Sequence, residues 1–184
     1  MPSIITKTPI FDTDHLVLTA EAAKRRFDRL RLDRVALLLL QDAPRPEDRD
    51  REALARGTAT RRNAIRIWQL SDEADLGRLL AINAHPAPPR MLRNAVAIAA
   101  ARIEAVLRVA GERVGTVAAV GAPQREPLAR VLGLPQVPNW NATTRLGEME
   151  VATIYHPSPR CRAYNPGGPG AAAVPLLRRW LKAA

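Results

Sequence analysis

The sequence predicts an α/β fold, a three-layer α/β/α sandwich around a central, mostly parallel sheet of four strands. Three observations predict it. Four short apolar runs of strand length alternate with segments in which apolar residues recur at helical spacing. Two of the runs, VALLLLQ and VGTVAAVG, are almost wholly apolar, as strands buried on both faces of a parallel sheet are. Strand alternating with helix indicates a layered α/β architecture.

The elements follow one another in a regular order. We expect strands over residues 35–41, 79–84, 114–121 and 149–155. Between and around them, amphipathic or alanine-rich patterns predict helices over residues 20–32, 58–70, 91–110, 123–132 and 174–181. The fourth of these helices has a proline near its first turn, where proline is tolerated. No internal repeat or low-complexity linker interrupts the pattern.

Length and composition indicate one globular domain. The chain has 184 residues, of which 47% are hydrophobic, enough for one compact core. We therefore expect a single domain over residues 1–184, with residues 1–19 as an N-terminal arm, and a monomer. The N-terminus does not resemble a signal peptide, and no apolar run is as long as a membrane span, so we expect a cytoplasmic, nucleoid-associated protein.

The charge of the chain predicts a polyanionic partner. Lys and Arg number 28 against 18 Asp and Glu, which gives a formal net charge of +10. Nucleic acid is the first expectation and an anionic membrane surface the second. A genome-wide bias toward Arg and Ala is the alternative explanation. Cys161 is the one cysteine, which excludes a disulfide or a cysteine-bound metal cluster within one chain, and we expect no metal and no other cofactor.

Proline-containing loops follow all four expected strands, and in three of them a polar or ionisable side chain comes just before the proline. In an α/β sheet, ligands bind at the carboxyl ends of the strands. Each of these loops contains proline, which fixes its own φ and restrains the preceding residue, so polar side chains are held there at low entropic cost. The polar residues and prolines of these loops include Gln41, Asp42, Pro44, Asn83, His85, Pro86, Pro123, Gln124, His156, Pro157, Ser158 and Pro159.

Four motifs, three at strand ends and one at a helix start, resemble those of the uracil-DNA glycosylase superfamily. His156-Pro157-Ser158-Pro159 matches the family's last motif residue for residue. Gln41-Asp42-Ala43-Pro44 aligns with its first motif in either of two registers, and both keep an acid at Asp42. Asn83 matches the asparagine after the second strand, and GTATRRN, residues 57–63, is similar to a helix-start segment. The similarity covers roughly residues 35–168, and the four motifs occur in the family's order.

Two departures mark an atypical branch. Leu40 stands where a glycine usually opens the first motif, and no tyrosine or phenylalanine follows Pro44. The family's stacking of an aromatic side chain on the base, and its exclusion of thymine, are therefore not carried over. One cysteine is too few to bind the iron–sulfur cluster that some branches of the family hold.

The resemblance implies roles for the residues that match. Asp42 would stabilise positive charge on the sugar and activate a water, and His156 would donate to the base oxygen where negative charge develops. Asn83 would read the imide edge of uracil, since cytosine leaves both amide groups unpaired. Other uracil-pocket candidates are Gln41, Ala43, Pro44 and His85. The plainer alternatives are a turn cap for Asp42 and structural histidines.

Basic and hydroxyl side chains near the motifs are candidate DNA contacts. The double proline makes Ser158 and Arg160 a stiff wedge beside a flipped base. A helix start with free N–H groups binds phosphate, although threonine capping explains the same pattern. The full set of DNA-binding candidates is Ser158, Arg160, Arg162, Thr58, Thr60, Arg61, Arg62 and Gln124. Trp140 is a further candidate, whereas Trp68 and Trp180 are expected in the core.

Three functions remain open from the sequence. The first is a monofunctional glycosylase of base excision repair, which removes uracil from single- or double-stranded DNA and leaves free uracil and an abasic site. The second is a DNA-binding protein with weak or no catalysis that recognises abasic or damaged DNA. The third is a small-molecule enzyme such as a nucleoside hydrolase, since fold alone does not choose among them.

Overall fold

The computed structural model describes residues 35–40, 58–70, 78–85, 94–158 and 160–183, together with Glu21, Lys24, Arg25, Asp28 and Leu54. The four isolated residues from Glu21 to Asp28 are helical, in the segment where a helix over 20–32 is expected. The expected N-terminal arm lies outside the described residues.

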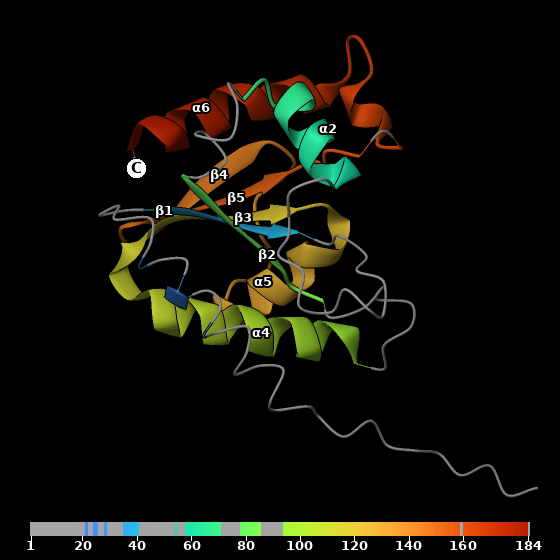
Figure 1. Cartoon of the computed structure of the whole chain (residues 1–184). Helices are drawn as coiled ribbons and strands as arrows, with labels where there is room; N and C mark the ends of the chain where they lie inside the picture. Colours follow the sequence, from blue (N-terminus) through green and yellow to red (C-terminus); the bar gives the residue numbers. More distant parts are fainter. Residues whose placement is uncertain are drawn as a thin grey trace, which may run out of the picture.

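A five-stranded sheet forms the centre of the molecule, in the order β2-β1-β3-β5-β4 (Figure 1). The four parallel strands are β1 (Val35–Leu40), β2 (Leu79–Asn83), β3 (Val114–Val120) and β5 (Met149–Ile154). They lie where the apolar runs predict them, and the α/β fold is confirmed.

The prediction of four strands was wrong by one. Strand β4 (Ala142–Leu146) pairs with β5 in antiparallel orientation, through a two-residue turn at Gly147 and Glu148. Gly147 has φ +60°, as short hairpin turns require. The sequence hides this strand because residues 143–146 are exposed at the sheet edge, so no buried apolar run marks them.

Two helical layers cover the sheet (Figure 1). Helices α4 (Ala95–Ala110) and α5 (Arg125–Val131) pack on one face. Helices α2 (Ala59–Ile67) and α6 (Ala173–Ala183) pack on the other, where Trp68 and Trp180 are buried as expected. Among the described helices, none has the length and apolar character that crossing a membrane requires.

The strand order places a topological switch point between β1 and β3. The chain moves from β1 to β2 on one side and then returns to β3 on the other side of β1. Connections that leave in opposite directions open a crevice at the carboxyl ends of the two strands, which is where open α/β sheets bind ligands. The strand-end motifs belong to this carboxyl edge of the sheet.

Candidate functional site

Three of the four strand-end segments meet at the carboxyl edge of the sheet. Asn83 ends β2 and pairs with Leu40 at the end of β1. Gly121 follows β3, and His156 follows β5 by two residues. Because Val120 pairs in register with Ile154, the segments after β3 and β5 leave the sheet side by side. The first motif, with Gln41, Asp42, Ala43 and Pro44, lies outside the described residues, as does Pro159.

His156 is held against the backbone of Gly121. The Gly121 N–H donates to Ile154 O at 3.0 Å and so extends the β3–β5 ladder to the base of the histidine loop. Gly121 has φ +93°, and a Cβ built there would lie 3.4 Å from the Cβ of His156. His156 itself is half-buried, and its Nε2 atom is inaccessible to solvent. A glycine at this strand end thus allows two neighbouring strand-end segments to pack closely.

A hydrogen-bonded chain braces the peptide that precedes His156. The Tyr164 hydroxyl donates to the carbonyl oxygen of Tyr155 at 2.7 Å, and the Trp68 indole N–H donates to the Tyr164 hydroxyl at 3.0 Å. Burial is the main cause that raises the pKa of Tyr164, so its hydroxyl stays protonated and able to donate at neutral pH. The chain links α2, the loop after β5 and the histidine. Sequence reasoning missed it, because Trp68 and Tyr164 are 96 residues apart.

Aromatic stacking fixes Tyr155 from another side. Its ring stacks on Trp140 with centroids 4.4 Å apart and planes 10° apart, and the Arg125 guanidinium lies 5.2 Å from the Trp140 centroid. Such contacts contribute about 0.5–1.5 kcal/mol beyond burial. Trp140, a candidate DNA contact from the sequence, is therefore engaged by two groups of the protein itself. The structure gives it a packing role in support of the His156 loop.

The residues after His156 form a compact turn. Ser158 N–H donates to His156 O at 2.8 Å, Cys161 N–H donates to Ser158 O at 2.9 Å, and Arg160 N–H donates to the Ser158 hydroxyl at 3.2 Å. The hydroxyl oxygen therefore accepts locally, while its O–H remains a donor for another group. Arg160 and Arg162 are both exposed. The turn thus carries one serine and two exposed arginines directly after the histidine.

The helix-start segment shows capping. Thr58 is the N-cap of α2, and its hydroxyl accepts from Arg61 N–H at 3.2 Å. The Arg61 guanidinium donates to Leu54 O at 3.0 Å. The plainer alternative for Thr58 therefore holds, because its side chain satisfies an N–H group that a phosphate would otherwise take. Thr60 is half-buried, and Arg62 is exposed on the same turn.

The other polar residues of this edge are buried. Asn83 is 8% exposed, His85 1% and Gln124 0%. Gln124 and His85 are thus enclosed by protein atoms, and their assignment to DNA and to the uracil pocket stays a prediction. Gln124 lies in a single 3-10 turn, Ala122–Gln124, between β3 and α5, whose residues 127–129 are buried. This packing, which the sequence does not reveal, turns the Gln124 side chain inward.

His85 and Gln124 approach each other across the carboxyl end of β1. They follow β2 and β3, the two neighbours of β1, so their contact spans the switch point. The contact is not an aligned hydrogen bond, since His85 Nδ1 and both amide atoms of Gln124 lack partners of good geometry. The pKa of His85 is lowered, and burial is the largest cause. The contact with Gln124 raises this pKa, and the positive charge of Arg102 lowers it further. His85 is therefore neutral at pH 7.

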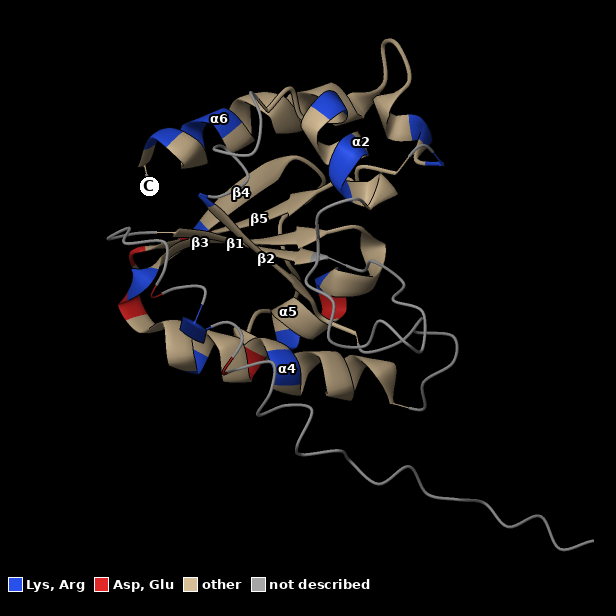
Figure 2. Ribbon diagram, in the orientation of Figure 1, with Lys and Arg blue, Asp and Glu red and all other residues tan. Residues whose placement is uncertain are grey.

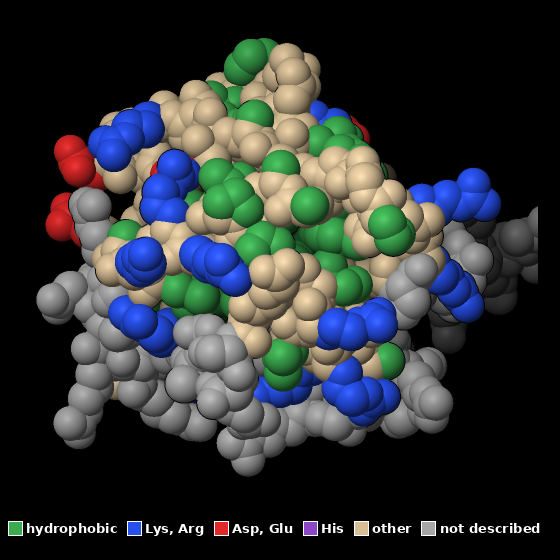
Figure 3. Space-filling view, turned by 90° about the horizontal axis from the view of Figure 1, so that it is seen from above, with side chains coloured by type: hydrophobic (Ala, Val, Ile, Leu, Met, Phe, Trp, Pro, Cys, Tyr) green, Lys and Arg blue, Asp and Glu red, His purple; other side chains and the backbone are tan. Residues whose placement is uncertain are grey.

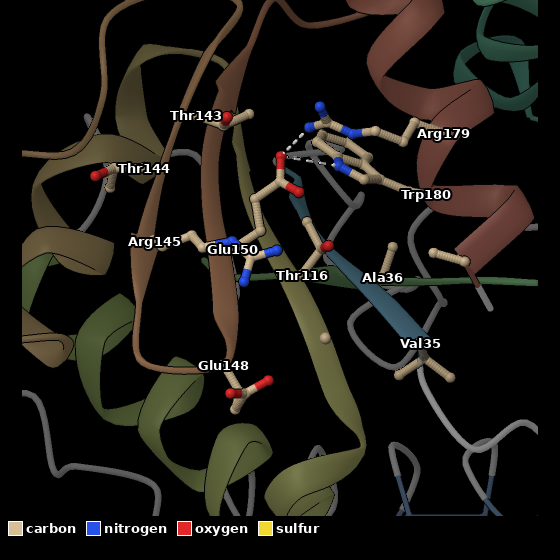
Figure 4. A pocket seen from close by; sticks show the side chains of 12 residues that line it. Val35, Ala36, Thr116, Thr143, Thr144, Arg145, Glu148, Glu150, Arg179 and Trp180 are labelled. Atoms are coloured by element: carbon tan, nitrogen blue, oxygen red, sulfur yellow. Dashed lines mark hydrogen bonds and ion pairs between the residues drawn. The ribbon is translucent and has the colours of Figure 1, made fainter.

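A separate cavity of about 410 Å³ lies at the amino edge, where β1, β3 and β5 begin (Figure 4). Its lining includes Thr116, Arg145, Glu150, Arg179 and Trp180. Glu150 accepts from the Arg179 guanidinium and from the Trp180 indole, which ties α6 to β5. The strand-end motif residues that the structure describes are not among its lining residues, so the cavity is distinct from the carboxyl edge of the sheet.

Comparison with known proteins adds no family to this description. No protein-family model matches the chain, and a search of the curated proteins finds no match. The fold defines the class of protein: an α/β protein with a five-stranded, mostly parallel sheet. Within the described part of the chain, no group of three metal-binding side chains is present.

Proposed function

We propose that the protein is a monofunctional DNA glycosylase that hydrolyses the N-glycosidic bond of uracil in DNA. The observation that supports it best is the setting of His156. The motif histidine stands beside the switch point, packed on Gly121 and preceded by a peptide that Tyr164 holds. A donor fixed before the reaction stabilises developing charge without reorganisation, which is the largest single source of catalysis in many enzymes.

Breaking the bond between uracil and its sugar requires stabilisation of two charges. Positive charge grows on the sugar and negative charge on the leaving base. In the proposal, the Asp42 carboxylate offsets the positive charge on the sugar and orients the attacking water. His156 donates a hydrogen bond to the base oxygen on which the negative charge develops. One such donor is worth about 10²–10³ in rate.

In this proposal, Asn83 provides the selectivity for uracil. It is 8% exposed at the end of β2, next to β1 in the sheet. An amide held in one orientation accepts from the imide N–H of uracil and donates to its carbonyl, whereas cytosine leaves both amide groups unpaired. Each unpaired buried group costs about 1–3 kcal/mol.

DNA would approach the exposed turn that follows His156. A base within a duplex reaches the site only after it is flipped out of the stack, at a cost of a few kcal/mol. In the proposal, the exposed side chains of Arg160 and Arg162 and the O–H of Ser158, which follow the histidine, hold the opened strand. Exposed Arg62 at the start of α2 is a further phosphate contact in the proposal.

The test is uracil release from end-labelled oligonucleotides, in chelator and followed by alkali. Substrates carry uracil, thymine opposite guanine, hypoxanthine or an abasic site, single- and double-stranded, with free nucleosides as a separate arm. We expect uracil-dependent breaks that Asp42→Asn and His156→Ala abolish or reduce by about 10²–10³. Arg130→Gln, an exposed change on α5, is the control that keeps activity.

Other outcomes decide against this proposal. Retention of abasic DNA with no breaks at high protein concentration would show a binding protein. Cleavage of nucleosides with no effect on DNA would show a small-molecule hydrolase. Full activity in Asp42→Asn and His156→Ala would remove the assigned residues from the chemistry.

A further inference from the structure

The two helical layers differ in the sign of their charge. Helices α2 and α6 contain six cationic residues and no acidic one: Arg61, Arg62, Arg66, Arg178, Arg179 and Lys182. Helices α4 and α5 mix both signs, with Glu104 and Glu126 beside their arginines. Figure 2 shows this difference, and the view onto the α2–α6 layer in Figure 3 shows Lys and Arg side chains spread over the surface. A general bias toward arginine does not explain why helices α2 and α6 contain no acidic residue.

Three of these cations form no ion pair with any residue that the structure describes. Arg179 forms an ion pair with Glu150 of β5, so its charge is compensated and it connects α6 to the sheet. Arg66 and Lys182 form no ion pair with the described residues, and Arg178 donates only to the neutral amide of Gln69 at 3.1 Å. All three are exposed. Arg178 and Lys182 lie on α6, and Arg66 lies on the neighbouring α2. We call these three residues together the α6 surface.

The spacing of this surface suits a phosphate chain. Arg178 and Lys182 are one helical turn apart, about 6 Å along the axis. A nucleic-acid strand carries one charge per about 3.4 Å of duplex axis, so one turn of α6 spans about two phosphates. A shallow groove of about 370 Å³ runs along α6 between Val174, Pro175, Arg178, Arg179 and Lys182. The Arg178–Gln69 bond joins this groove to the end of α2, which carries Arg66.

The apolar side of α6 argues against a membrane as the partner. A helix that binds a lipid surface inserts an apolar face into it. Here Leu177, Trp180 and Leu181 are buried against the sheet and are not available. The large apolar side chains that are exposed among the described residues, Val109 and Leu146, lie on other elements.

We propose that the α6 surface binds the phosphate backbone of nucleic acid, at a place separate from the turn after His156. It would hold a stretch of strand away from the reacting base. The inference goes beyond uracil excision, because a chain without any glycosylase activity would still show this binding.

Salt-dependent binding to uracil-free DNA tests the proposal. Dissociation constants for a labelled oligonucleotide, single-stranded and duplex, are measured between about 50 and 200 mM salt. Each lost phosphate contact reduces the slope of log K against log salt by about 0.7–0.9. We expect Arg178→Gln/Lys182→Gln to reduce the slope by about 1.4–1.8. Both positions are exposed, so unfolding is expected to change by less than about 0.5 kcal/mol per site.

A matched variant distinguishes the effect of phosphate contacts at the α6 surface from the effect of a lower net charge of the protein. Arg108→Gln/Arg130→Gln removes the same two charges from exposed positions on α4 and α5, and its slope is expected to equal that of the unchanged protein. A wild-type slope in the α6 variant would overturn the proposal. An equal fall in both variants would show only the effect of net charge. Loss of binding to anionic phospholipid vesicles in the α6 variant, with an unchanged DNA slope, would assign the surface to lipid instead.

Discussion

The hydroxyl of Tyr164 donates to the carbonyl oxygen of Tyr155 at 2.7 Å, which fixes the peptide plane that enters His156. The hydroxyl itself accepts from the indole N–H of Trp68, the C-cap residue of α2. The position of the histidine thus depends on side chains outside its own motif. Its neighbours Pro157 and Ser158 stiffen the turn after it, and Tyr164 secures the peptide before it.

Removal of the Tyr164 hydroxyl tests this bracing. Tyr164→Phe leaves the Tyr155 carbonyl and the Trp68 indole without their partner, so we expect a loss of about 1–3 kcal/mol in unfolding free energy. If His156 acts as proposed, kcat for uracil release falls while KM and the affinity for abasic DNA stay unchanged. Denaturant unfolding and steady-state kinetics measure the two effects.

Tyr155→Phe is the matched control for that variant. It removes a phenol hydroxyl one residue from His156, but this hydroxyl forms no hydrogen bond with the described residues, and the carbonyl and ring remain. We expect near-wild-type stability and kinetics. Equal losses in both variants would mean that the Tyr164–Tyr155 hydrogen bond has no special part in holding the loop.

Trp68 is expected to act on the same peptide through Tyr164. In a double-mutant cycle, Tyr164→Phe should lower the unfolding free energy less in the Trp68→Phe protein than in the unchanged protein. The reason is that the hydrogen bond between Trp68 and Tyr164 is then already absent. Contacting residues couple by about 0.5–3 kcal/mol. Additive unfolding free energies would contradict a shared network.

Gly121→Ala is expected to destabilise the protein by about 1–2 kcal/mol, because φ +93° is strained for any residue with a Cβ. The added methyl group also lies in contact distance of His156, so we expect slower uracil release. Gly133→Ala is the control, since it has φ +64° but open space around it and lies away from the histidine. It should lose stability without a change in rate.

His85 predicts a dependence of stability on pH. Its pKa is lowered in the folded protein, so the unfolded chain takes up a proton first as the pH falls. The His85 contribution is complete above the unfolded value of 6.5 and decreases as the pH falls toward the lower folded pKa. His85→Gln should flatten this part of the profile of unfolding free energy between about pH 7.5 and 5. An unchanged profile would place the titration elsewhere.

Thr58→Ala distinguishes a helix cap from a phosphate contact. Loss of the bond to Arg61 N–H should lower the unfolding free energy by about 1 kcal/mol. Affinity for DNA and its salt slope should stay unchanged, because the threonine oxygen is occupied by its own helix. A reduced affinity at unchanged stability would restore Thr58 to the DNA contacts.

By itself, the sequence determined the four parallel strands and the helices between them, because apolar runs and helical spacing are local consequences of burial. It also placed Asn83 and His156 at strand ends, where parallel strands must meet at one edge. Only the tertiary structure decided the edge strand β4 and the inward turn of Gln124. It alone brought Trp68 to Tyr164 and Trp140 to Tyr155. These contacts join residues far apart in the chain, and no local pattern encodes which distant side chain packing will bring near.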